Sequence, residues 1–250
     1  MSDETNPVNL SPGTSWSRPG MIAVSLVIVL CPAALCLAGA RVTGQIGLAF
    51  VAAPTGVVLA WWMLRLRGEG WADVGLRRAC SAKRLFAVVC AATPIILVGA
   101  FFLGALLAAA TGRRPDTSAF DRLRGNPTAF AVWLLLVWTT AAFGEEMLMR
   151  GFVMHSLHRL MGRIGGNRQP WAWALVVTAV VFGAAHAYQG LAGCILTGII
   201  GCGYGLGFFV CRRNLWAAIL THGAYDTVGF LFVYMSWDKL LRPATLLGGA

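Results

Sequence analysis

Two adjacent glutamates and an arginine stand at the end of an otherwise apolar stretch, and they are the first residues whose types and spacing suit chemistry. They are Glu145, Glu146 and Arg150. Residues four apart share one face of a helix, so Glu146 and Arg150 are expected to form an ion pair. Glu145 is rotated by about 100° and is left to face a cavity and take a proton from water. The simpler alternative is an ion pair that ends a helix at the lipid headgroups.

Two further pairs with the same spacing follow on later apolar segments. Phe182 and His186 are four residues apart, and so are His222 and Asp226. A single histidine near the end of an apolar segment is common at a membrane interface, so His186 alone decides little. His222 and Asp226 lie deep in an apolar segment, where unpaired ionisable groups cost at least ~2.5 kcal/mol each. This second pair therefore predicts a functional site.

These residues permit hydrolysis by acid–base catalysis without a metal ion. Glu145 would act as general base on a water molecule, while His186 would orient that water or carry its proton. His222 and Asp226 would face the substrate carbonyl and the negative charge that develops on its oxygen. An ionised carboxylate only accepts hydrogen bonds, so Asp226 must be protonated or must act by fixing the His222 ring.

A metal site is the alternative use of the same side chains. The familiar zinc pattern of two histidines at i and i+4 with a glutamate between them is missing from the sequence. His222 and Asp226 could still bind a divalent metal together with His186 and Glu145. We predict that no metal or other cofactor is required and keep this bound metal as the alternative. The seven cysteines are scattered and predict neither a zinc cluster nor a disulfide framework.

The segments that carry these residues are predicted to be membrane-spanning helices. The chain has 250 residues, of which 58% are hydrophobic and 12% are charged. Its apolar blocks are about 20 residues long and continuous, as a spanning helix requires and a spanning strand does not. We predict an all-α polytopic transmembrane bundle of about seven spans, with a buried polar site formed by the late helices. The predicted spans are 21–40, 46–64, 85–110, 128 to about 149, 171–188, 191–210 and 215–234.

Domain organisation and topology follow from the polar segments. Residues 1–20 are polar and hold three prolines, which predicts a disordered tail before a single integral membrane domain over residues 21–250. The net charge is +10, but the basic residues lie in the connections, where they predict topology and not nucleic-acid binding. A cytoplasmic N-terminus places most of them inside. We therefore predict this orientation in the plasma membrane, the inner membrane of the cell.

The depth of the polar residues constrains the helices. Turn signals before Pro170 predict a helical hairpin that carries Glu146 and His186 at equal depth on its two arms. A straight sixth span would move His222 to the other half of the bilayer, so some helix must be short, tilted or broken. The glycine-rich stretch 190–207 is the best candidate for a break, although its glycines would equally allow close helix packing.

Taken together, the three motifs resemble the CPBP or Abi family, which contains CAAX prenyl endopeptidases and bacteriocin-processing proteins. The resemblance covers a core of about residues 125–235, and a segment at residues 71–76 is also similar to one often found in that family. The motifs, in order on successive late spans, are Glu145-Glu146-x-x-x-Arg150, Phe182-x-x-x-His186 and His222-x-x-x-Asp226.

The resemblance implies a glutamate-type intramembrane endopeptidase that cleaves a membrane-associated protein or (lipo)peptide. By motif position, Glu145 would be the base and His186 its water partner, with His222 and residue 226 on the oxyanion side. Supporting roles would fall to Glu146, Arg150 and Phe182. The prenyl-protease branch carries Asn at position 226, where this chain has Asp. The resemblance therefore does not carry over a prenylated substrate.

Two other functions would use the same buried groups. A non-catalytic membrane scaffold or immunity protein would keep the architecture and bind a partner. A small proton-linked transporter would use Glu145, His186 and Asp226, although no inverted repeat is visible and the first three spans lack charged positions. For the peptidase, the expected partners are a peptide or lipidated protein substrate and the lipid bilayer, and nucleic acid is not among them.

Overall fold

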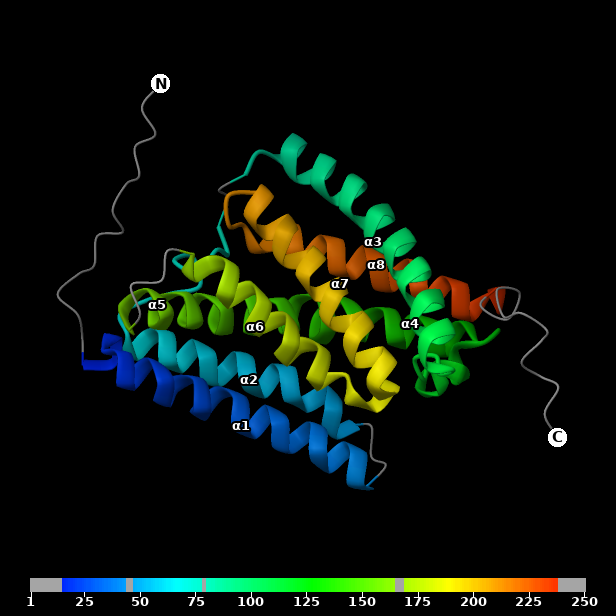
Figure 1. Ribbon diagram of the computed structural model, residues 1–250, viewed down its shortest axis with the longest axis horizontal. Helices are drawn as coiled ribbons and strands as arrows, with labels where there is room; N and C mark the ends of the chain where they lie inside the picture. The colour runs from blue at the N-terminus through cyan, green and yellow to red at the C-terminus, as the bar shows by residue number, and fades with distance from the viewer. Residues whose placement is uncertain (1–14, 44–46, 78–79, 165–168, 238–250) are drawn as a thin grey trace.

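The computed structural model describes residues 15–43, 47–77, 80–164 and 169–237, and every regular element in these ranges is helical (Figure 1). The all-α prediction is confirmed for this part of the chain. The long helices are α1 (Pro19–Thr43), α2 (Gly47–Leu66), α3 (Ala82–Thr111), α4 (Pro127–Leu136), α5 (His155–Ile164), α6 (Pro170–Ala185), α7 (Gly190–Val210) and α8 (Leu215–Tyr234). Two π-helical segments are η3 (Val137–Glu145) and η4 (Met147–Met154), and three short 3₁₀ turns are η1 (Ser15–Ser17), η2 (Ser118–Leu123) and η5 (Ala187–Gln189).

Four helices are long and apolar enough to cross a membrane. They cover Pro19–Thr43, Ala82–Thr111, Pro127–Arg163 and Ala187–Val210. Large apolar side chains such as Phe86 and Ile95 point outward, as they do on a surface that faces lipid. The chain is therefore an integral membrane protein built as a helical bundle. The remaining predicted spans correspond to the shorter apolar helices α2 and α6 and to α8, so the number of seven crossings stays a prediction.

The N-terminal segment differs in part from its prediction. Residues 1–14 of the tail predicted for residues 1–20 lie outside the described residues. Ser15–Ser17 form a 3₁₀ turn and Pro19 begins α1, so the end of the predicted tail is ordered. The reason is local packing, because Trp16 contacts the apolar core and the Ser17 carbonyl accepts a hydrogen bond from Arg163.

The helices surround the segment that carries the two glutamates. α1 and α2 lie side by side on one flank of the bundle, and α3 packs against α7 and α8 on the other (Figure 1). All eight residues of η4 are buried. The centre of the molecule is therefore the helix that holds the first motif.

The fourth predicted span is longer and less regular than its pattern indicated. Residues 127–164 form one continuous helix through α4, η3, η4 and α5, with π-helical turns on both sides of Glu146. Such turns are rare and occur frequently at functional sites. No feature of the sequence pointed to them.

Of the two options for the late helices, α6 is short, and the break for which residues 190–207 were the best candidate is absent. With 16 residues, α6 rises about 24 Å, less than the ~30 Å of a bilayer core. α7 runs from Gly190 to Val210 without a break, and its glycines serve packing. A side chain at Gly183 would collide with the Cys194 carbonyl, and one at Gly198 would lie 3.1 Å from the Ala179 carbonyl oxygen. The two helices thus touch backbone to backbone.

The loop ahead of α3 braces the central helix. Gly75 has a φ of 113°, and a side chain there would lie 2.6 Å from the Arg213 carbonyl oxygen. The backbone N–H of Leu215 donates a hydrogen bond of 2.9 Å to the Gly75 carbonyl. Trp71, from the same loop, packs over Gly151 in η4. Glycine is therefore required at position 75, where the loop meets the turn between α7 and α8.

Candidate active site

The predicted ion pair between Glu146 and Arg150 is present in the interior of the bundle. Arg150 Nη1 donates to Glu146 Oε1 at 2.8 Å, and the two side chains are 1% and 0% exposed. Arg150 Nη2 also donates to the Gly201 carbonyl in α7 at 2.5 Å, and its guanidinium lies 4.8 Å from the centre of the Phe182 ring in α6. The pair therefore ties three helices together. Because the helix continues to residue 164, the pair does not end a helix at the headgroups.

Glu146 has a second partner, which its spacing did not predict. His222 Nδ1 lies 3.0 Å from the same Oε1 atom, and His222 Nε2 lies 3.3 Å from Asp226 Oδ2. Both ring nitrogens thus face carboxylate oxygens, and only the doubly protonated imidazole donates to both. Of the two roles predicted for Asp226, this contact supports the one in which it fixes the His222 ring.

Tyr204 is a member of the site that sequence reasoning missed. Its ring stacks on the His222 ring with centroids 4.5 Å apart and planes inclined by 17°, and it is 1% exposed. The Phe182 ring is nearly perpendicular to the His222 ring, with the two centroids 6.0 Å apart. The signal was available, because Tyr204 precedes the turn before α8 by about as many residues as His222 follows it. Equal spacing from a hairpin turn predicts equal depth.

Glu145 keeps the free carboxylate that its position predicted. Its Oε2 atom is buried and has no hydrogen-bond partner among the described residues. The titratable groups whose charge would act on it are His186, His222, Asp226 and Glu146. An unpaired acceptor next to two imidazoles suits a group that holds water and takes its proton.

His186 lies immediately after the last residue of α6. Its Nδ1 atom is 2.8 Å from the Phe182 carbonyl oxygen. A carbonyl only accepts hydrogen bonds, so Nδ1 carries a proton, and in this tautomer of the imidazole the lone pair is on Nε2. The Phe182 and His186 rings are 4.8 Å apart, so the second motif acts as one unit. The free Nε2 is the atom that could orient water.

The three motifs meet in one cluster, which contains every residue predicted for the site. The four residues predicted to be catalytic are Glu145, His186, His222 and Asp226, and those predicted to support them are Glu146, Arg150 and Phe182. Within the described ranges, no three His, Cys, Asp or Glu side chains are grouped as metal ligands. The absence of a required metal stays a prediction.

Comparison with known proteins agrees with the geometry. Residues 127–228 match the family model of the Rce1-like proteins, described as type II CAAX prenyl endopeptidase Rce1-like. No curated protein and no solved structure matches the chain. The match begins at α4, ends in α8 and includes all three motifs, close to the core expected at residues 125–235. Over this core, the chain is similar to the Rce1-like CAAX endopeptidases, which supports membership in the CPBP or Abi family.

Proposed function

We propose that the protein is an intramembrane endopeptidase that hydrolyses a peptide bond of a membrane-associated protein or (lipo)peptide. The observation that carries the proposal is the buried Oε2 of Glu145, which has no hydrogen-bond partner among the described residues and adjoins the cluster of Glu146, His222 and Asp226. The match to a protease family and the apolar helices long enough to cross a membrane both support intramembrane peptidase activity. The substrate is accordingly a polypeptide that reaches the site from the bilayer or its cytoplasmic edge.

In the proposed reaction, Glu145 removes a proton from a water molecule held by His186 Nε2. The water oxygen attacks the peptide carbonyl carbon, and the carbonyl oxygen gains negative charge. Glu145 then returns the proton to the leaving amine, so that hydroxyl and hydrogen are added across the broken C–N bond. No covalent enzyme intermediate is needed.

The second part of the mechanism is stabilisation of the oxyanion, which we assign to His222. Because both of its N–H groups are bonded to carboxylates, His222 would act on the oxyanion through the positive charge of its imidazolium, not as a hydrogen-bond donor. Glu146 and Asp226 hold the two nitrogens of this ring, and Arg150 compensates the charge of Glu146. Asp226 would therefore act as a positioning residue for His222.

The orientation and location are part of the proposal. A cytoplasmic N-terminus in the plasma membrane puts most basic residues of the connections inside, in accord with the positive-inside rule. The hydrolysis site would then be accessible to lipidated or membrane-inserted polypeptides from that side. Position 226 is Asp, where the prenyl-protease branch has Asn. The proposal therefore does not specify a prenyl group on the substrate.

Comparative analysis of protein termini in membranes tests the proposal. Cells that express wild-type protein, Glu145→Gln or the surface control Asp121→Asn would be compared by mass spectrometry. We expect new protein termini with the wild-type protein and the control, and none with Glu145→Gln. Identical termini in all three samples would point to a scaffold or immunity protein. Proton-coupled flux in proteoliposomes without a peptide product would point to a transporter.

A further inference from the structure

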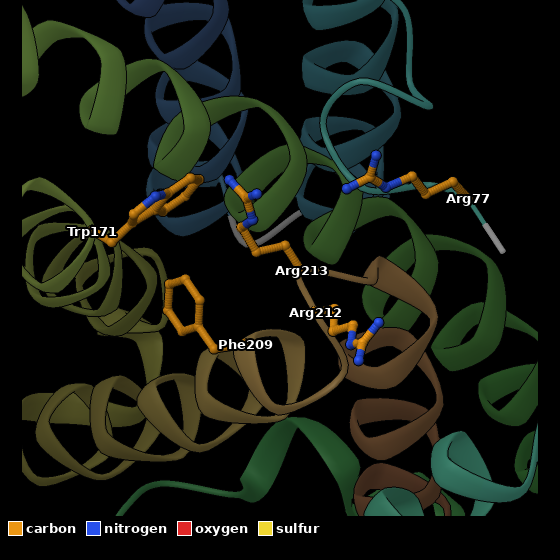
Figure 2. A pocket seen from close by; sticks show the side chains of 5 residues that line it. All are labelled: Arg77, Trp171, Phe209, Arg212 and Arg213. Atoms are coloured by element: carbon orange, nitrogen blue, oxygen red, sulfur yellow. The ribbon is translucent and has the colours of Figure 1, made fainter. Parts of the chain in front are cut away.

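A second polar feature lies at the ends of α6, α7 and α8, away from the acidic cluster. It is a pocket of 640 Å³ whose lining residues appear in Figure 2. Its lining consists of Arg77, Trp171, Phe209, Arg212 and Arg213. Trp171 and His186 stand at opposite ends of α6, about 22 Å apart along the helix. The pocket is therefore separate from the proposed catalytic site.

The pocket is strongly basic and has no internal counter-charge. Arg77, Arg212 and Arg213 are all exposed, and no carboxylate is among the lining residues. In the described part of the chain, none of the three guanidinium groups forms an ion pair. Figure 2 shows Arg77 and Arg213 reaching toward the same space from different segments. Three uncompensated positive charges around one hollow favour an anionic ligand.

The backbone that presents two of these arginines is held in an unusual conformation. Arg212 and Arg213 have φ angles of 56° and 60°, in the left-handed region that non-glycine residues rarely adopt. The turn is fixed by a 2.8 Å hydrogen bond from the Arg213 N–H to the Phe208 carbonyl. Such conformations persist where surrounding structure enforces them, and they are frequent at ligand sites. The arginines are thus presented by a fixed turn.

The aromatic side of the pocket is equally well packed. Trp171 stacks against His158 at 3.8 Å, and Phe209 meets it edge-on at 5.6 Å. The Arg213 guanidinium lies 5.4 Å from the centre of the Trp171 ring. Trp side chains are enriched at the membrane–water interface, where one side of the ring meets lipid and the other meets polar groups. This wall suits the apolar part of an amphipathic molecule.

We propose that this pocket binds the phosphate-bearing headgroup of an anionic phospholipid. Guanidinium groups bind phosphate oxygens in pairs, and basic pockets between the ends of transmembrane helices accommodate such headgroups. The glycerol end of the lipid would lie against Trp171 and Phe209, in line with the bilayer. Because it rests on charge and membrane location alone, the proposal holds whether or not the protein is a peptidase.

Native mass spectrometry of the full-length protein in detergent tests the site. The protein would be incubated with phosphatidylglycerol or with phosphatidylcholine that has the same acyl chains. The test variant is Arg77→Gln/Arg212→Gln/Arg213→Gln. The matched control, Arg113→Gln/Arg114→Gln/Arg122→Gln, removes three exposed arginines beyond the other end of α3.

Each basic residue is expected to contribute about fivefold to retention of the anionic lipid. The test variant should therefore lose at least about tenfold in phosphatidylglycerol retention, while the control keeps the wild-type value. Equal retention by wild type and test variant, or an equal loss in the control, would overturn the proposal. If the triple variant fails to fold, Arg212→Gln alone, with an expected loss of about fivefold, decides in its place.

A competition experiment separates a lipid site from a site for free phosphate. Inorganic phosphate at millimolar concentration should leave phosphatidylglycerol retention unchanged within twofold. If phosphate displaces the lipid from the wild-type protein but not from the test variant, the pocket binds a soluble anion. That result would contradict the headgroup proposal.

Discussion

The Nδ1 atom of His222 lies 3.0 Å from the Oε1 atom of Glu146, a contact that joins α8 to the junction of the two π-helical segments. The same oxygen accepts the hydrogen bond from Arg150. The two adjacent glutamates therefore have different roles. Glu146 is engaged in holding other side chains, which leaves Glu145 as the carboxylate available for chemistry.

Substitution of Glu146 should affect stability first. Glu146→Gln removes the charge that compensates buried Arg150, and breaking such a pair costs roughly 3–5 kcal/mol. We expect a clearly lower thermal unfolding temperature for Glu146→Gln in detergent, measured by intrinsic fluorescence, and a nearly unchanged one for Glu145→Gln. An unfolding temperature of Glu146→Gln equal to that of the wild type would show that Glu146 has no structural role.

Substitution of Asp226 should affect the rate through His222. Loss of a carboxylate that orients a metal-bound histidine typically reduces activity about 10- to 100-fold, and we expect a loss of similar size for Asp226→Ala. Asp226→Asn keeps a carbonyl oxygen that accepts from Nε2–H, so its loss should stay below about tenfold. The peptide cleavage rates of the two purified variants test this prediction. A larger loss in the Asn variant than in the Ala variant would argue against the positioning role.

Removal of metal ions should leave the activity intact. The proposed reaction uses only Glu145 and His186 to activate water. Protein treated with EDTA and 1,10-phenanthroline and then freed of chelator is expected to retain its full cleavage rate. If the treated protein is inactive and its cleavage rate returns on addition of Zn²⁺, this prediction is wrong and the metal alternative holds.

A pair of thiols offers an independent check of the packing around α7. Cys80 Sγ lies 3.2 Å from Cys211 Sγ, although the two residues are far apart in the sequence. Burial, and after it the hydrogen bond with Cys80, raises the pKa of the Cys211 thiol to about 11. Its thiolate is therefore scarce at pH 7 and becomes more abundant as the pH rises toward that value.

Mild oxidation by diamide should consequently link these two cysteines slowly at pH 7 and faster at pH 9. Alkylation under denaturing conditions, followed by mass measurement, should then count five free thiols of the original seven. The Cys80→Ser variant should retain all six of its thiols. Linkage between any other two cysteines would contradict the placement of the loop ahead of α3.

Local features of the site could be predicted from the sequence. Long apolar blocks mark the helices, because a bilayer demands a minimum apolar length. The Glu146–Arg150 pair follows from helical spacing, and counting along a hairpin predicts a common depth for Glu146 and His186. The family resemblance rests on the same three short motifs.

Features that depend on packing between distant helices could not be predicted. His222 and Glu146 are 76 residues apart, and their contact depends on how α8 crosses the central helix. The π-helical turns and the early end of α6 likewise have no counterpart in the apolar pattern of the sequence.

The most direct test of the central claim compares cleavage rates of purified protein reconstituted in liposomes, with a substrate identified from the altered termini. Removal of the general base should lower the rate of Glu145→Gln about 10²- to 10⁴-fold, while Asp121→Asn stays at the wild-type rate. Both variants should keep the wild-type unfolding temperature. A Glu145→Gln protein that cleaves within twofold of the wild-type rate would contradict the assignment of Glu145 as the base.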